Sequence, residues 1–147
     1  MTTVMRRINI ISRAQGVYRA DMLRESGLSA CHHSYVLAIC NHPGLSQEEL
    51  ARHICINKSN VARALMHLEA HGFVERRQSE RDRRLFCVYP TARMLAVLPA
   101  VQAITEDWND YLTEGLSEQE IAAFYATLEK MTARAQQYVA GREEINE

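Results

Sequence analysis

The chain has 147 residues, of which 47% are hydrophobic and 24% are charged, and its formal net charge at pH 7 is −1. This length and apolar content suit one compact domain with a buried core. No apolar run approaches the roughly 20 residues that cross a membrane, and the N-terminus lacks the charged, apolar and small-residue regions of a secretion signal. We therefore expect a single domain over residues 1–147, located in the cytoplasm and without a membrane partner.

The N-terminal segment predicts a helix of about twenty residues with an apolar stripe on one face. The stripe consists of Val4, Ile8, Ile11, Tyr18 and Met22. No element within so small a domain is an obvious partner for this stripe.

A second helix is expected to begin after Ser29, whose hydroxyl suits an N-cap. Cys31 then lies in the first turn beside His32 and His33, where the positive end of the helix favours a thiolate. Cys31 is therefore either a small apolar residue packed at the helix start or an oxidant-sensing thiol. A metal site made with both histidines is disfavoured, because adjacent helical residues point in different directions. Without a secretion signal the cysteines are expected to be reduced, with three in apolar patterns of the core: Cys40, Cys55 and Cys87.

Two short helices follow, and their ends can be predicted from residue types. Ser46 and Glu49 form a capping box that starts one helix, which stops near Cys55. Asn57 caps the next helix about three residues later, and Gly72 supplies the left-handed residue that ends it. The inward stripe of this second helix is Val61, Leu65 and Leu68.

The outer face of that helix is polar, as in the recognition helix of a helix-turn-helix, which meets base edges and phosphates in the major groove. His67 and His71 have a spacing that could hold a metal, but we interpret His67 as a residue beside phosphate and His71 as an ordinary last-turn residue. The predicted DNA contacts of the helix are Asn57, Lys58, Ser59, Asn60, Arg63 and His67.

After Gly72 the pattern alternates and predicts a two-stranded ribbon. Its first strand contains Arg76 and Arg77. Successive side chains of a strand point to opposite faces, so only one of the two can face DNA, and we predict that it is Arg77. The tip carries three arginines that suit the narrow minor groove, although a solvated hairpin tip is the plain alternative. Asp82 is expected to brace the tip by holding one guanidinium bidentately. The three tip arginines are Arg81, Arg83 and Arg84.

The rest of the chain predicts two more helices. One opens near Thr91 and runs toward Gly115 past Pro99, and a second capping box at Ser117 and Glu120 starts the last. The last helix carries a stripe that, like the N-terminal one, could pack against a second copy of the chain. Its members are Ile121, Phe124, Tyr125, Leu128, Met131, Ala135 and Tyr138.

Charge is divided unevenly along the chain. Residues 57–93 contain eight basic and four acidic residues, a local net charge of +4. Residues 105–147 contain three basic and ten acidic residues, a local net charge of −7. The near-neutral total therefore conceals a basic segment suited to nucleic acid and an acidic C-terminal segment.

The sequence resembles the multiple antibiotic resistance regulator (MarR) family. The matching residues are Leu50–Ala51, Asn57–Arg63, Leu68–Arg76 and Asp82–Arg84, flanked by Gly27–Ser29 and Leu116–Glu120. Two features depart from the family pattern. Cys55 stands where members usually have Gly, and Pro90 and Met94 surround Thr91 where Leu-Thr-x-x-Gly is usual.

The resemblance implies a mainly α fold with a small β-ribbon (α+β): a winged helix-turn-helix lobe over residues 30–91 and dimerisation helices over 1–26 and 92–142. It also implies a homodimer on a pseudo-palindromic DNA operator, acting as a repressor that a small aromatic or phenolic effector releases. The crevice for that effector could be lined by Tyr18, His33 and Tyr35.

Two other functions stay open from the sequence: a redox-sensing regulator acting through Cys31, and a winged-helix protein-interaction module without specific DNA binding. No phosphate-binding glycine loop, paired metal motif or nucleophile elbow is present, so neither an enzyme nor a cofactor is expected.

Overall fold

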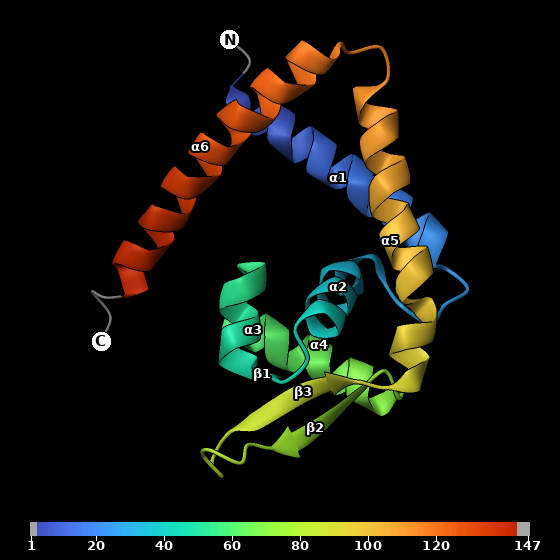
Figure 1. The fold of residues 1–147 in the computed structure, drawn as a ribbon, viewed down its shortest axis with the longest axis vertical. Coiled ribbons are helices and arrows are strands. Elements are labelled where there is room, and N and C mark those ends of the chain that lie inside the picture. Colours follow the sequence, from blue (N-terminus) through green and yellow to red (C-terminus); the bar gives the residue numbers. More distant parts are fainter. Residues whose placement is uncertain (1–2, 144–147) are drawn as a thin grey trace. The chain divides into compact units, whose positions relative to one another are not determined.

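The computed structural model describes residues 3–143 and is mainly α-helical with a small antiparallel sheet, as predicted (Figure 1). Residues 1–2 and 144–147, the ends of the predicted domain, lie outside the described residues. The elements are α1 (Val4–Leu23), the 3₁₀ turn η1 (Ala30–His32), α2 (His33–Asn41), β1 (Leu45–Ser46), α3 (Gln47–Ile54), α4 (Lys58–Ala70), β2 (Val74–Gln78), β3 (Phe86–Pro90), α5 (Ala92–Thr113) and α6 (Glu118–Glu143).

The chain divides into two compact units, Met1–Trp108 and Asn109–Glu147. The first unit contains α1 to β3 and most of α5, and its core is one continuous apolar cluster. Residues from α2, α3, α4 and the sheet supply this cluster, together with Phe73 and the inner face of α5. The predicted inward stripe of α4 is confirmed, because Val61, Leu65 and Leu68 are all 0% exposed.

The predicted helix ends are confirmed at the level of hydrogen bonds. The Ser46 amide donates to Glu49 Oε2 at 2.8 Å, and the Glu49 amide donates to Ser46 Oγ at 3.2 Å. At the start of α4 the Asn60 amide donates to Asn57 Oδ1 at 2.9 Å. Gly72 ends α4 with φ +73°, and the Phe73 amide then reaches back to the Leu68 carbonyl. That bond closes the turn that aims the chain into β2.

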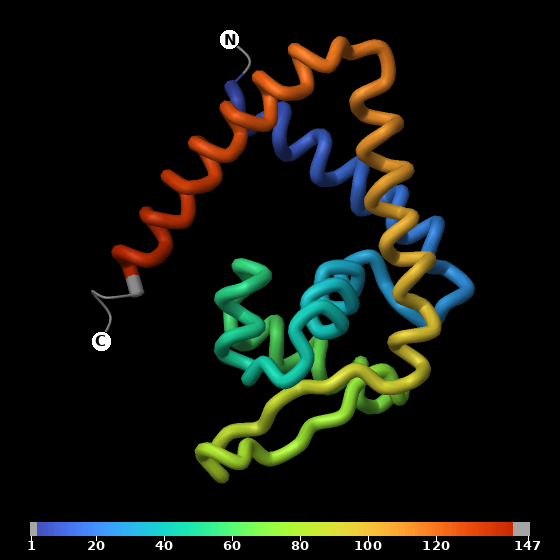
Figure 2. Tube along the Cα trace, in the orientation of Figure 1, coloured from blue at the N-terminus to red at the C-terminus, as the bar shows by residue number. Residues whose placement is uncertain are grey.

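The sheet has three strands in the order β1-β3-β2, one more than the sequence indicated. β2 and β3 form the antiparallel ribbon, with Arg76 opposite Val88 and Gln78 opposite Phe86. β1 adds two residues to the other edge of β3, with Leu45 opposite Val88. This strand is too short to give an alternating pattern, which is why the sequence did not reveal it. Figure 2 follows the chain from α4 through the ribbon into α5.

Thr91 joins the end of the ribbon to α5. Its hydroxyl lies 2.6 Å from the Gly72 carbonyl and 3.0 Å from the Phe73 carbonyl, and it is 3.4 Å from the amide of Met94. The side chain therefore ties the end of β3 to the turn that precedes β2. This role depends on the hydroxyl at residue 91 alone, so the family's usual Leu and Gly around it can be replaced by Pro90 and Met94.

The second unit contains the end of α5 and all of α6. The Ser117 amide donates to Glu120 Oε2 at 2.9 Å and the Glu120 amide to Ser117 Oγ at 3.3 Å, which confirms the second capping box. None of the described α6 side chains is buried. Its large exposed apolar residues are Phe124, Tyr125, Met131, Tyr138 and Val139. Across the described part of the chain, no helix combines the length and apolar character that crossing a membrane requires.

The prediction that three cysteines lie in the core is wrong for Cys55, which is exposed, while Cys40 and Cys87 are half-buried. Cys55 ends α3 with φ 55° and ψ 42°, in the left-handed region, and its amide donates back into the helix. The backbone conformation at this helix cap, rather than apolar packing, determines that the Cys55 side chain is exposed. A left-handed conformation disfavours any residue with a Cβ, which explains why glycine is usual here.

We predict that Cys55→Gly stabilises the protein by about 0.5–1 kcal/mol, because glycine adopts this conformation without a Cβ clash but loses more backbone entropy on folding. The matched control is Cys55→Ala, which removes the thiol and keeps the Cβ. Urea unfolding followed by circular dichroism should show a higher midpoint for the glycine variant only. A midpoint for glycine no higher than that for alanine would contradict this account of the cap.

Candidate nucleic-acid interface

The exposed face of α4 places several polar side chains together on the side opposite the core. Ser59, Asn60, Arg63 and His67 are all exposed. The guanidinium of Arg63 donates to Asn60 Oδ1 at 2.9 Å, one turn earlier. This bond restricts the Arg63 rotamer and leaves its other N–H groups available, as bidentate contact with a base edge requires.

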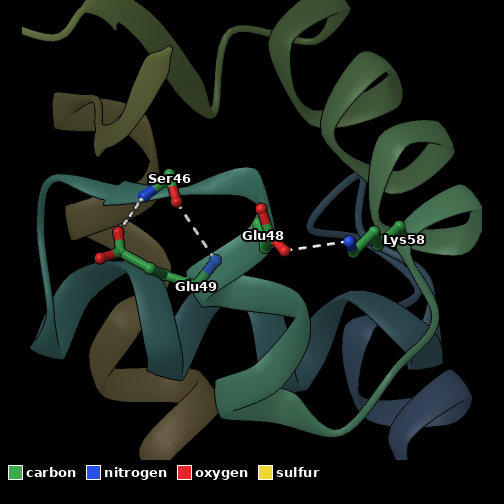
Figure 3. A network of polar contacts seen from close by, with 4 residues as sticks. All are labelled: Ser46, Glu48, Glu49 and Lys58. Atoms are coloured by element: carbon green, nitrogen blue, oxygen red, sulfur yellow. Dashed lines mark hydrogen bonds and ion pairs between the residues drawn. The ribbon is translucent and has the colours of Figure 1, made fainter. Parts of the chain in front are cut away.

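Asn57 and Lys58, two of the predicted DNA contacts, hold partners at the ends of α3 and α4. Asn57 Oδ1 accepts from the Asn60 amide and from the Ser59 hydroxyl, both at 2.9 Å, so Asn57 is chiefly a cap. Lys58 Nζ donates to Glu48 Oε1 at 2.9 Å across the turn between α3 and α4 (Figure 3). The hydrogen bond and charge of Lys58 lower the pKa of Glu48. Both side chains are exposed, so a phosphate can replace Glu48 at little cost.

His67 lies in a column of three stacked imidazoles that the sequence did not predict. Its ring centroid is 4.7 Å from that of His32 in η1 and 4.0 Å from that of His71. His71 Nδ1 lies 2.8 Å from the His67 carbonyl oxygen, which fixes the last ring. Because the Ser29 amide donates to His32 Nδ1 at 3.1 Å, a neutral His32 carries its proton on Nε2. The column connects η1 to the exposed face of α4.

The tip of the ribbon is ordered by backbone hydrogen bonds, and the predicted form of the Asp82 brace is wrong. Asp82 Oδ1 accepts from the backbone amide of Arg84 at 2.9 Å, and no ion pair of this carboxylate occurs within residues 3–143. An aspartate reaches an amide two residues on more readily than it fixes a flexible guanidinium, because the resulting turn is local. Asp82 therefore shapes the tip without neutralising it.

The arginines of the ribbon fall into two groups. Arg76 is partly buried and pairs with Glu69 of α4 at 2.7 Å, so it joins the ribbon to the helix. Arg77 is exposed, pairs with Glu75 and lies over the Tyr89 ring at 4.5 Å. In the described part of the chain, no ion pair is formed by Arg81, Arg83 or Arg84. The three tip arginines therefore have no ion-pair partner there, and residues 80–84 carry three positive charges against two negative ones.

Comparison with known proteins shows which proteins the sequence and the fold resemble. A sequence model of the MarR family matches residues 28–86. The chain is 26% identical to YybA, an uncharacterized HTH-type transcriptional regulator of Bacillus subtilis (strain 168), over 95% of each chain. The solved structure of the transcriptional regulator SlyA has a TM-score of 0.89 and 27% identity, covering 92% of this chain and 96% of that one. The chain thus matches the MarR family over residues 28–86 and resembles its regulators in sequence and fold.

YybA and SlyA are both transcriptional regulators, and this chain resembles YybA in sequence and SlyA in both sequence and fold. A MarR family regulator from Listeria monocytogenes, solved in complex with a 26mer DNA, shares the fold with a TM-score of 0.87. It is 24% identical, and the match covers 93% of this chain and 91% of that one. At this identity the likeness concerns the fold alone.

The three residues predicted to line an effector crevice differ in their surroundings. Tyr18 is half-buried and stacks on Trp108 with ring centroids 5.1 Å apart. Tyr35 is 2% exposed and belongs to the core cluster, and His33 is 1% exposed. Two surface depressions lie away from these residues, one along α1 and one at the end of α5. The predicted residues thus lie in or beside the core of the first unit.

The positive charge of Arg19 lies near enough to His33 to lower the pKa of that imidazole. His33 Nε2 lies 3.1 Å from both the Val101 carbonyl oxygen and Thr105 Oγ1, while its buried Nδ1 has no hydrogen-bond partner among residues 3–143. Arg19 is half-buried and makes no ion pair within residues 3–143. The signal in the sequence is an arginine directly after Tyr18, a member of the apolar stripe of α1.

Cys31 is exposed, and its Sγ lies 3.0 Å from Ser29 Oγ. No cluster of three or more histidine, cysteine, aspartate or glutamate side chains suited to a metal ion occurs in the described part of the chain. The predicted α-helical first turn is instead the 3₁₀ turn η1. The Cys31 thiol therefore has a polar neighbour on the surface, and its redox role stays a prediction.

Two buried histidines predict a loss of stability in mild acid. Burial lowers the pKa of His33 to about 4, with Arg19 contributing in the same direction. Burial, with smaller contributions from His67 and His71, lowers the pKa of His32 to about 4. Between pH 6.5 and 4 the unfolded chain binds these protons and the folded chain does not, so stability falls as the pH falls. We expect a loss on the order of 1 kcal/mol per ring at pH 5.

This expectation can be measured by thermal unfolding between pH 7.5 and 4.5, with His33→Gln as the test variant and the exposed His42→Gln as the control. The His33 variant should show a shallower pH dependence than the wild type, and the His42 variant should not. A histidine proton resonance of His33 that titrates near pH 6.5 in the folded protein would refute the assignment.

Proposed function

We propose that this chain is a MarR-family regulator, a dimeric repressor that binds a pseudo-palindromic DNA operator and is released by a small aromatic effector. The observation that carries the DNA-binding part is the combination of two surfaces. α4 exposes Ser59, Asn60 and Arg63 on one face, and the ribbon tip carries three arginines without carboxylate partners. A polar helix suits the major groove, and a basic ribbon suits the adjacent minor groove.

The two surfaces have different tasks in this proposal. Arg63, restrained by Asn60, contacts the O6 and N7 atoms of a guanine and so contributes base preference. Arg84 and its neighbours at the tip meet phosphates and the electronegative minor groove, which contributes affinity with little base preference. Arg77 joins this second group only if phosphate displaces Glu75 from its guanidinium.

Dimerisation is supported by apolar surface that a single chain leaves in water. On α1 the exposed large apolar residues include Val4, Ile10, Ile11, Val17 and Met22, and α6 exposes a similar set. α1 carries four arginines and one aspartate, whereas the C-terminal segment is acidic. Apolar stripes flanked by charges of opposite sign favour pairing with a second copy. Two copies related by two-fold symmetry would contact half-sites about one helical turn apart, roughly 10 base pairs.

The proposed effector site centres on Arg19 and His33. A half-buried guanidinium without a carboxylate attracts a carboxylate or phenolate, and the His33 Nδ1 lone pair can accept from a phenol hydroxyl. The stacked rings of Tyr18 and Trp108 offer an aromatic surface nearby along α1. The effector would reach Nδ1 only by displacing side chains that cover the ring. It would therefore favour a second arrangement of the lobe and shift the population away from the DNA-bound form.

The DNA-binding proposal predicts different effects for Arg63→Ala and Arg84→Ala. On duplexes selected by the full-length protein from a randomised pool, Arg63→Ala should lose about 1–3 kcal/mol of binding free energy and relax the preference at one base pair. Arg84→Ala should weaken binding similarly on all sequences and reduce the salt slope by about 1. Fluorescence anisotropy at several salt concentrations measures both effects.

Arg24→Ala is the control, because Arg24 is equally exposed but pairs with Asp21 at the end of α1. It should bind like the wild type, with two chains per duplex. Selection that yields no preferred DNA, together with a shallow salt dependence, would favour the protein-interaction alternative. Normal affinity in both the Arg63 and Arg84 variants would exclude the proposed docking.

The effector proposal predicts that salicylate, which carries a carboxylate and a phenol, releases DNA from the wild type. Arg19→Gln should bind DNA normally and need about tenfold more salicylate for release, since a charge-assisted hydrogen bond is lost. Arg24→Gln serves as the control for a general loss of charge on α1. Equal release from Arg19→Gln and the wild type would exclude Arg19 from the site.

A further inference from the structure

Met66 is a large apolar side chain on the exposed face of the recognition helix. It is 64% exposed, more than most large apolar residues of the chain. With 3.6 residues per turn, it lies roughly 130° around the α4 axis from the buried stripe of Val61, Leu65 and Leu68. That position puts it on the same side of the helix as Ser59 and Arg63, seven and three residues earlier.

The core of the lobe gives Met66 no packing role. α4 buries Val61, Leu65 and Leu68 completely without it. The polar residues of this face are the predicted DNA contacts, and Met66 is not among them. An apolar side chain among polar groups that bind DNA needs an apolar feature of the DNA to contact.

The major groove contains one such feature that depends on sequence, the C5 methyl group of thymine. Hydrogen bonds cannot recognise this methyl group, whereas an unbranched thioether can adapt its three torsions to cover it. Contact would remove both the methyl group and the exposed thioether from water.

The spacing along α4 relates this contact to the one proposed for Arg63. Met66 follows Arg63 by three residues, a rise of about 4.5 Å along the helix axis. Base pairs are stacked about 3.4 Å apart. If Arg63 contacts a guanine, Met66 reaches the groove about one base pair further along. The hydrogen bond from Arg63 to Asn60 joins the guanidinium to a residue toward the start of the helix, whereas Met66 lies toward its end.

We infer that Met66 is a specificity-determining residue that recognises the methyl group of a thymine in each operator half-site, next to the base pair contacted by Arg63. This inference rests on the proposed function, because it requires α4 to lie in the major groove. It adds an apolar determinant to a face whose other members act through hydrogen bonds and charge.

The test replaces thymines by deoxyuridine, which removes the methyl group and leaves base pairing unchanged. Duplexes are first selected from a randomised pool with the full-length wild type, and each thymine is then replaced singly. Wild-type affinity, measured by fluorescence anisotropy, should fall about fourfold at one thymine per half-site, the effect of exposing about one methyl group. Met66→Gln should lose this difference between thymine and deoxyuridine, whereas Met66→Leu should keep it.

Leu95→Gln is the matched control, since Leu95 is a similarly exposed apolar residue on α5. It should show the wild-type deoxyuridine pattern. Circular dichroism should give the same unfolding temperature for the Met66 variants and the wild type, because the side chain is exposed. If the wild type selects no DNA, the proposed function and this inference both fail. If it selects DNA but Met66→Gln keeps the same deoxyuridine pattern, only the inference fails.

Discussion

The burial of one stripe on α4 is the constraint on which the interface depends. Val61, Leu65 and Leu68 are completely buried, so the helix cannot rotate about its axis without exposing them. The fixed orientation of α4 about its axis determines which side chains face outward, and it places Ser59, Arg63 and Met66 on one exposed side. The caps at Asn57 and Gly72 fix the length of the helix around the same stripe. Packing in the core thus determines which groups the helix presents to solvent.

At the tip of the ribbon, three arginines have no ion-pair partner among the described residues, although carboxylates are close to them in the sequence. Acidic and basic residues are mixed along the ribbon, yet Glu69 and Glu75 are occupied by Arg76 and Arg77, and Asp82 binds a backbone amide. The tip arginines have no such partner within residues 3–143. A near-neutral protein can therefore present a strongly basic surface, since the local arrangement rather than the total charge determines what a phosphate meets.

The sequence predicted the features that depend on neighbours three or four residues away. Both capping boxes, the Asn57 cap, the glycine end of α4 and its buried stripe are of this kind. Features that depend on distant parts of the chain were missed. β1 pairs with a strand about forty residues later, and His33 meets Val101 and Thr105 of α5. A contact between residues far apart in the chain leaves no periodic pattern in the sequence from which its partner could be predicted.

Two errors show how local geometry overrides residue type. Cys55 was assigned to the core because its neighbours are apolar, yet its left-handed backbone directs the chain out of α3 and leaves the side chain exposed. Asp82 was assigned to a guanidinium because three arginines surround it, yet the amide of Arg84 is within reach without any loss of side-chain freedom at the arginines. In both cases the backbone turn, not the composition around it, decides the contact.

His32 and His33 link the proposed effector site to the proposed DNA surface, because they are adjacent residues that face different elements. The ring of His33 meets α5 and has Arg19 of α1 nearby, whereas the ring of His32 stacks on His67 of α4. In the proposed mechanism a ligand that displaces His33 would also move His32, because the two residues are adjacent in the backbone. The stacked rings of His32 and His67 would carry that movement to α4. The ligand would bind one position of the His32–His33 segment more tightly than the other. The free-energy difference between these two binding events is the largest change in DNA affinity that the ligand could cause.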